Sequence, residues 1–447
     1  MKRRWLDDHW RDLLIVVAGF AVVLRVLLIA RAPVYGYVWD FYQEGVARLY
    51  ENGRLPLSTD CWQCYHPPLF YWLGWPFYAV GARLSAGGDG LAWRMLAGES
   101  LLSVGVLVYY GVRLLLLVGC RRASLVAGVS LLLMTPLLFI VSDGPDGDVL
   151  AAGVLTGFAF HATRIFGRRR AIGARDAVAL GLLAGLAMAT KYSGLVALVA
   201  ATVLVGMRLT EREDRAATLR AGAIILLLSV AIGGWKYVDN ARRYGTLMFA
   251  NGSAAEGFAG GGRQGREAYE FASIRLIELR QLFGRGAPRG QLTEFRVYRS
   301  VLTSLHAQVW SDMSLFSVRG RHGDLDRSYA TKDIPVSLTM TVIVLGFVPE
   351  VLAILGVIVS ARHRLVRPLL VFAAITLVAY VWWFLTQPRW ALKAKYLLPL
   401  LPIGVVFATI GQAWLARRAP ALAVITAVLL VALGVAAHVY MLMFATL

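Results

Sequence analysis

Cysteine is scarce in this 447-residue chain, and its scarcity restricts what thiol chemistry the chain can perform. Cys61 and Cys64 form a C-x-x-C motif in the first polar segment, and Cys120 stands alone at the end of an apolar run. No second cysteine pair completes a zinc site, and no βαβ pattern surrounds the motif. A redox pair and half of a zinc site stay open, but in an oxidising compartment a structural disulfide is the preferred interpretation.

Acidic residues are also few, 27 against 46 lysines and arginines, which gives a net charge of +19. These cations lie mainly in short loops between apolar runs, a pattern typical of membrane topology, so nucleic-acid binding is disfavoured. No phosphate-binding glycine loop occurs, because residues 257–265 are glycine-rich without a following Gly-Lys-Ser/Thr. We expect a hinge there instead. No internal repeat is present, which weakens an inverted-repeat transporter.

Hydrophobic residues make up 58% of the chain, and apolar runs long enough to cross a bilayer recur along most of its length. The first run is longer than the apolar core of a signal peptide, so we interpret it as an uncleaved span. The sequence predicts an all-α polytopic membrane protein with about 11 transmembrane helices, near residues 13–31, 91–117, 123–141, 147–165, 175–190, 193–208, 219–238, 336–360, 368–386, 396–415 and 419–443.

Arginines alternate between the predicted loops and orient these spans. They concentrate in the loops near residues 121–122, 164–175, 208–220, 362–367 and 417–418, which we place in the cytoplasm together with the N-terminus. The predicted location is the bacterial inner membrane. The opposite, outer side then receives residues 32–90, 142–148, the neighbourhood of Lys191, 239–335 and 386–395.

Two outer segments are longer than a connection requires, and they divide the chain into three blocks. Residues 1–238 form a transmembrane catalytic module that includes the outer loop 32–90, residues 239–335 a small outer domain or loop, and residues 336–447 the last spans. Within the first outer loop we expect one helix from Asp40 to a stop at Asn52-Gly53. A second opens at Pro67-Pro68 and continues through an aromatic run suited to the interface.

Asp40 and Glu44 lie four residues apart, so a helix would place both carboxylates on one face. An acidic pair at a helix start also suits the helix dipole without any catalytic role. The neighbouring aromatics, among them Tyr42, favour burial of these carboxylates, and burial would raise their proton affinity toward that of a general base.

Three further acids, Asp143, Asp146 and Asp148, lie between the third and fourth predicted spans. Asp148 begins a span, where a carboxylate can simply cap the helix. With Glu44 and His66 these acids could instead hold a hard cation, so a divalent metal is left open although no ligand spacing requires it.

Cations in the outer loops contradict the positive-inside bias and therefore point to an anionic ligand. Arg389, Lys393 and Lys395, with Tyr396 beside them, lie in one outer loop, and Lys191 lies in another. Lysines that anchor helix ends are the structural alternative. We favour a lipid phosphate, for which arginine supplies a fork of donors and lysine a point charge. Arg25 and Arg94, at or near spans, are secondary candidates.

His66 precedes two prolines that fix the direction of the backbone. A single histidine in a loop is usually only a polar surface residue. Here the fixed geometry makes a ligand or hydrogen-bonding role plausible.

The succession of these motifs resembles the GT-C superfamily of membrane glycosyltransferases, especially bacterial relatives of protein O-mannosyltransferases and of the lipid A aminoarabinose transferase. The family pattern has an acidic motif after the first span, a Lys- or His-Pro-Pro-Leu motif, an Asp at the fourth span, and Lys-Tyr-Ser-Gly-like and Lys-Tyr-x-x-Pro-like stretches. The corresponding residues here are Asp40 and Glu44, His66–Leu69, Asp148, Lys191–Gly194 and Lys395–Pro399. The chain departs from the pattern because its two acids are not adjacent.

The resemblance implies a sugar transferred from a polyprenyl-phosphate donor to an acceptor hydroxyl on the outer face, with inversion. Asp40 would be the base, and Lys191, Arg389, Lys393 and Lys395 would hold the phosphate. The acceptor is left open among protein, lipid and cell-wall glycan. The alternatives are a transporter or flippase of an anionic lipid or solute, and a non-catalytic assembly subunit.

Overall fold

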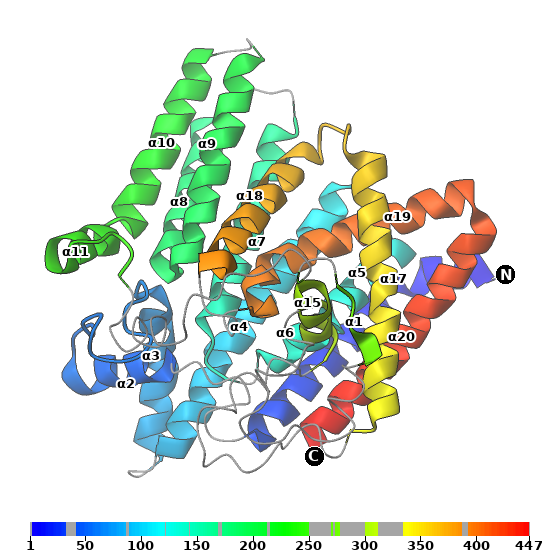
Figure 1. Cartoon of the computed structure of the whole chain (residues 1–447), viewed down its shortest axis with the longest axis horizontal. Coiled ribbons are helices and arrows are strands. Elements are labelled where there is room, and N and C mark those ends of the chain that lie inside the picture. Colours follow the sequence, from blue (N-terminus) through cyan, green and yellow to red (C-terminus); the bar gives the residue numbers. More distant parts are fainter. Residues whose placement is uncertain are drawn as a thin grey trace.

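The structure is a computed structural model of the chain, and every regular element in its described part is a helix (Figure 1). The described residues are 2–32, 42–85, 89–120, 122–142, 144–168, 172–211, 215–249, 270, 273–277, 300–311, 334–386 and 392–446. The predicted hinge at 257–265 lies outside them, as do Asp40, Asp143 and Arg389.

Eight helical segments of the described chain are long and apolar enough to cross a membrane. They fall on α1 (Lys2–Arg31), α4 (Asp89–Leu117), α7 (Gly147–Phe166), α9 (Leu195–Thr210), α10 (Arg215–Gly233), α17 (Val336–Ser360), α19 (Leu401–Arg418) and α20 (Pro420–Thr446). The other three predicted spans fall on α5 (Ala123–Leu133) with α6 (Pro136–Ile140), on α8 (Ala174–Thr190) and on α18 (Arg367–Thr386). The polytopic all-α architecture is confirmed, and the count of eleven stays a prediction.

The predicted span 123–141 is broken, since α5 ends at Leu133 and α6 begins at Pro136. Pro136 has no backbone N–H to donate and disfavours helical backbone at the residue before it, which favours an interruption at this point. The intramembrane Arg25 lies at this break. Its guanidinium is almost fully buried and reaches the Leu133 carbonyl oxygen at 3.4 Å, besides the carbonyl of Ala21 in its own helix. Arg25 therefore stabilises a helix end with its charge.

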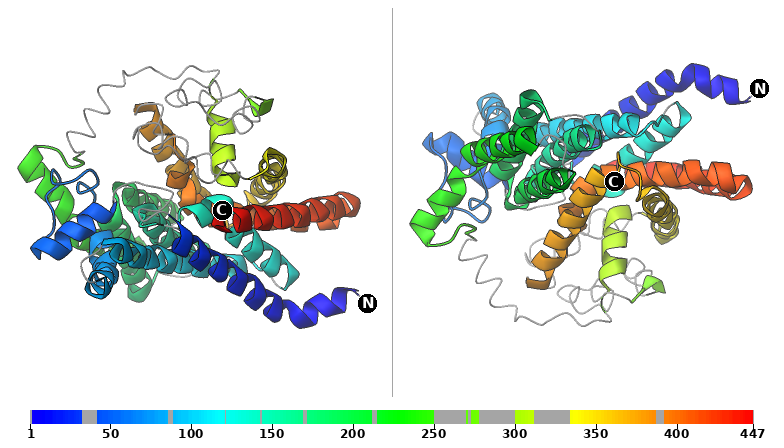
Figure 2. Two further views of the ribbon diagram at one scale, coloured as in Figure 1. Left: turned by 90° about the horizontal axis from the view of Figure 1, so that it is seen from below. Right: turned by 90° about the horizontal axis from the view of Figure 1, so that it is seen from above.

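Helix α7 forms the centre of the molecule and is buried along nearly its whole length. It packs against α4 and α8, while α8 packs against α10 (Figure 1). On the other side of the molecule α17, α19 and α20 pack together, and α20 returns to contact α1 (Figure 2). Arg31 of α1 donates a hydrogen bond to the Thr446 carbonyl of α20, at 2.7 Å.

Both helices expected in the first outer loop are present, as α2 (Tyr42–Asn52) and α3 (Leu69–Leu84). Gly53 follows α2 with φ of +63°, a backbone conformation that favours glycine and ends the helix. Cys61 and Cys64 are joined by a disulfide in the turn between the two helices. The long outer segment is described only in part, by the end of α11 (Trp235–Tyr244), residues 270 and 273–277, and α15 (Val301–Trp310), so the three predicted blocks stay a prediction.

A substitution at Gly411 tests the close contact between α17 and α19. A Cβ atom there would lie 2.1 Å from the Leu352 carbonyl oxygen, whereas one at Gly404 in the same helix would meet nothing within 4 Å. We expect Gly411→Ala to destabilise the fold by about 1–3 kcal/mol, the usual cost of overpacking. Gly404→Ala should leave the melting temperature unchanged or slightly raised. Equal melting temperatures for the two variants in detergent would contradict this packing.

Candidate functional site

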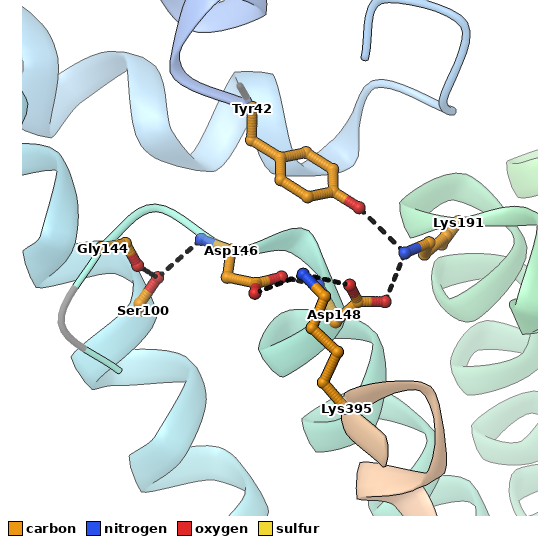
Figure 3. Close-up of polar contacts among 7 residues, drawn as sticks. All are labelled: Tyr42, Ser100, Gly144, Asp146, Asp148, Lys191 and Lys395. Atoms are coloured by element: carbon orange, nitrogen blue, oxygen red, sulfur yellow. Dashed lines mark hydrogen bonds and ion pairs between the residues drawn. The ribbon is translucent and has the colours of Figure 1, made fainter. Parts of the chain in front are cut away.

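Four charged side chains meet at the beginning of α7 and form what we name the charged cluster: Asp146, Asp148, Lys191 and Lys395 (Figure 3). The ammonium of Lys395 lies 2.9 Å from Asp146 Oδ2 and 3.1 Å from Asp148 Oδ2. Lys191 forms an ion pair with the other carboxylate oxygen of Asp148. All four residues are buried, so the two negative and two positive charges compensate one another away from water.

The two carboxylates are placed by the start of α7 itself. Asp146 is the N-cap residue, and its carboxylate accepts a hydrogen bond of 2.8 Å from the Asp148 backbone N–H. Helix N-termini favour negative charge, because their first N–H groups have no partner within the helix. The preceding loop is held on α4 by Ser100, whose hydroxyl accepts from the Asp146 N–H at 3.1 Å and donates to the Gly144 carbonyl at 2.7 Å (Figure 3).

The two lysines come from breaks in regular helix. Lys191 is the extended residue between α8 and the short 3-10 helix η1 (Tyr192–Gly194). Lys395 lies near the start of a second 3-10 helix, η5 (Ala394–Leu400), which leads into α19. The segments that meet here are those that the arginine pattern assigns to the outer side.

Two aromatic side chains, Tyr42 and Tyr396, lie next to the ammonium of Lys191. The ammonium donates to the Tyr42 hydroxyl at 2.9 Å and lies 4.8 Å from the centre of the Tyr396 ring, a distance typical of a cation–π contact. The Tyr42 ring in turn stacks on His66, with ring centres 5.6 Å apart. Six of the predicted site residues are thus brought together: Tyr42, His66, Asp148, Lys191, Lys395 and Tyr396.

Other predicted site residues lie apart from the charged cluster or outside the described chain. Glu44 is half-buried in the first turn of α2, and burial raises the pKa of its carboxyl, against the opposing effects of Arg48 and of the Trp62 N–H. Arg94 donates to the carbonyls of Ile29 and Ala30 at the end of α1. Lys393 is half-buried two residues before Lys395.

Asp40 and Arg389 lie outside the described residues, so the roles that the sequence predicts for them stay predictions. Among the residues that the structure does describe, no three His, Cys, Asp or Glu side chains gather as metal ligands.

A second polar network, which the sequence analysis missed, lies beside His66. The buried Lys236 of α11 donates to the Ser58 hydroxyl at 2.9 Å, and Ser58 donates to the Asn240 side-chain oxygen at 3.2 Å. Asn240 donates to the hydroxyl of Tyr192, the neighbour of Lys191. Burial lowers the pKa of Lys236. The signal was present in the sequence, since Lys236 is a cation at the outer end of a predicted span.

A cavity of about 160 Å³ opens along this second network. His66 and Tyr71 line it from the first outer loop, and Lys236, Asp239 and Arg243 line it from α11. His66 lines the cavity and stacks on Tyr42, and Tyr42 accepts a hydrogen bond from Lys191. The cavity is therefore connected to Lys191 through the His66 and Tyr42 side chains.

Comparison with solved structures identifies the fold. The archaeal oligosaccharyltransferase AglB from Archaeoglobus fulgidus, solved with an inhibitory peptide and a dolichol-phosphate, aligns with 99% of this chain and 56% of its own. The TM-score is 0.55 and the identity 16%, so the chain spans little more than half the length of AglB. ArnT from Cupriavidus metallidurans, solved bound to undecaprenyl phosphate, aligns with 91% of this chain and 79% of its own, at a TM-score of 0.39 and 17% identity.

No protein-family model and no curated protein sequence matches the chain. AglB and ArnT are both GT-C membrane glycosyltransferases. The alignment with AglB therefore shows that the chain has the GT-C fold, which confirms the resemblance found in the sequence at the level of architecture.

Removing one lysine from the charged cluster tests its charge balance. We expect Lys395→Met to destabilise the protein by about 3–5 kcal/mol, because two buried carboxylates would then share one cation. Combining it with Asp146→Asn leaves one lysine and one aspartate, and should recover much of the loss. Lys393→Met is the matched control for stability. Thermal unfolding in detergent of the wild type, of the single variants Lys395→Met and Asp146→Asn, and of the double variant gives the coupling. Additive losses in the double variant would refute the charge balance.

The raised pKa of Glu44 predicts a pH-dependent contribution to stability. A carboxyl whose folded pKa lies above its unfolded value stabilises the fold below the unfolded pKa, and this contribution is lost as pH rises through the folded pKa. The melting temperature of the wild type relative to Glu44→Gln should therefore fall as pH rises above the ordinary value of 4.5. The exposed Glu51→Gln in the same helix is the control. A difference that does not change with pH would contradict the prediction.

Proposed function

We propose that the protein transfers a sugar from a polyprenyl-phosphate carrier to an acceptor hydroxyl on the outer face of the membrane. The observation that supports this best is the meeting of Lys191 and Lys395 with Tyr42 and Tyr396, in a chain with the GT-C fold. AglB was solved with a dolichol-phosphate, which makes a lipid phosphate a reasonable ligand class for a chain of this fold.

The phosphate would bind beside the charged cluster without dismantling it. A lysine ammonium has three N–H donors. Lys191 directs two of them to Asp148 and to the Tyr42 hydroxyl. In this proposal the third donates to a phosphate oxygen, while Lys393 and Arg389 add positive charge near it. The aspartates keep both lysines in place when no donor is bound.

The reaction would be a single displacement at the anomeric carbon. Asp40 accepts the proton of the acceptor hydroxyl, and the hydroxyl oxygen forms the new bond to the anomeric carbon with inversion. The bond from that carbon to the phosphate oxygen breaks, and the lipid phosphate leaves with the electron pair. Cations next to the leaving group stabilise its developing charge, so no second carboxylate is needed as a proton donor.

The proposed route for the acceptor is the cavity beside His66. Its lining includes a carboxylate, two cations and two aromatic side chains, which are groups that can orient a polar acceptor. The Tyr42–His66 stack lies between this cavity and Lys191. In this arrangement donor and acceptor approach from opposite sides of the same pair of rings.

Asp40→Asn tests the chemical step directly. We expect transfer from a polyprenyl-phosphate sugar to fall by about 10²–10⁴-fold, the usual contribution of a general base. Native mass spectrometry should detect unchanged binding of undecaprenyl phosphate, because in this proposal the lysines hold the phosphate. Asp12→Asn, at an exposed position of α1, is the control.

The same experiment separates the alternative functions. Full activity in Asp40→Asn would reject Asp40 as the base. If the wild type moves a polyprenyl phosphate across liposome membranes but transfers no sugar, the transporter alternative is favoured. Buried ionisable groups near membrane spans also serve transport. Neither activity, with no bound polyprenyl phosphate, would favour an assembly subunit.

A further inference from the structure

A buried glutamine on the long outer segment hydrogen-bonds to the backbone on both sides of Lys393. We name the segment that carries Lys393 and Lys395 the basic loop. The side-chain nitrogen of Gln308 donates to the Leu392 carbonyl at 3.0 Å, and its side-chain oxygen accepts from the Ala394 N–H at 2.8 Å. Lys393 between them is extended, with φ of −120° and ψ of 121°. The amide thus takes the place that a neighbouring strand would occupy in a sheet.

Helix α15, which carries Gln308, is itself packed against α17 (Figure 2). His306 Nδ1 lies 2.8 Å from a carboxylate oxygen of Glu350, and Trp310 donates to the same oxygen at 2.9 Å. The other ring nitrogen, His306 Nε2, lies 2.7 Å from the Ile343 carbonyl oxygen, which can only accept a hydrogen bond. Two ring nitrogens and an indole N–H therefore fix one face of α15 on a membrane span.

The other end of α15 is fixed as well. Ser300 caps the helix by accepting from the Thr303 N–H, and its hydroxyl donates to the Ser273 carbonyl. The Thr303 hydroxyl accepts from the Arg275 N–H at 2.9 Å. Since both ends are held, Gln308 has little freedom to follow the basic loop if the loop moves.

We propose that Gln308 is a positioning residue for the basic loop, and that α15 is the means by which the long outer segment organises the site. Fixing the backbone on both sides of Lys393 also sets the path of the chain into Lys395, whose ammonium joins the charged cluster. The ligand so served is the phosphate of the lipid carrier. This inference rests on the proposed function.

Glutamine suits position 308 because its side chain is long enough to reach the backbone and because its amide carries both a donor and an acceptor. Glutamate would keep the acceptor for the Ala394 N–H and place a second oxygen against the Leu392 carbonyl, and leucine would keep only the volume. A matched control exists in α19, where Gln412 donates to the Ala423 carbonyl and accepts from the Thr426 hydroxyl. Gln412→Leu likewise removes one donated and one accepted hydrogen bond, but within α19, far along the chain from Lys393.

The experiment compares Gln308→Leu, Gln308→Glu and Gln412→Leu with the wild type. Hydrogen exchange of a peptide covering residues 392–400 reports the backbone directly, whatever the protein's function. We expect faster exchange in both Gln308 variants and not in Gln412→Leu. The Kd for undecaprenyl phosphate should rise by about tenfold in Gln308→Leu, roughly the loss of two net hydrogen bonds, and less in Gln308→Glu.

Each outcome bears on a different step of the inference. Unchanged exchange in Gln308→Leu, or equal effects of Gln308→Leu and Gln412→Leu on the Kd, would overturn it. Faster exchange with an unchanged Kd would show that Gln308 fixes the loop without serving the phosphate, which also overturns it. If the wild type binds no undecaprenyl phosphate and transfers no sugar, the proposed function fails, and the exchange result still decides whether Gln308 holds the loop.

Discussion

Two lysines and two aspartates share one buried volume at the start of α7, and three separate segments of the chain supply them. A buried charge without a partner is costly, so none of these segments can leave without exposing the others to that cost. The charge balance therefore connects the α7 N-terminus, the break after α8 and the entry to α19. The other features of the site, from the Tyr42–His66 stack to the placement of η5, depend on that connection.

The helices that build the site differ from those that form the bulk of the bundle. The spans provide a scaffold of closely packed apolar faces, while α2, α3, α11 and α15 carry or hold the polar side chains around the charged cluster. This division suits a membrane protein, because breaks and short helices can present backbone groups and charges only where other parts of the protein cover them. In such a design the spans supply rigidity, and the short elements determine what the site can bind.

The sequence was informative wherever a residue contradicted its expected surroundings. Lys191 and Lys395 were recognisable because outer loops rarely carry cations, and α2 and α3 because Gly53 and Pro67-Pro68 mark their boundaries. The pairing of these lysines with Asp146 and Asp148 was not predictable, since the partners are distant in sequence and no sequence pattern indicates which acid a given lysine will meet. Gln308 gave no signal either, because an uncharged amide in a polar segment looks like any surface residue until its backbone partners are known.

The contact between α1 and α20 has a consequence for how the protein is made. The helix nearest the N-terminus enters the membrane early in synthesis, yet its Arg31 reaches a carbonyl at Thr446. During the intervening synthesis α1 must persist beside lipid or a chaperone on the face that α20 finally covers. The hydrogen-bond partner of Arg25 lies in α5, which is made much earlier than α20. The buried charge can therefore be hydrogen-bonded early, and the part of α1 that α20 later covers is mainly apolar. The contact between α1 and α20 can therefore form only after the helices between them have been made.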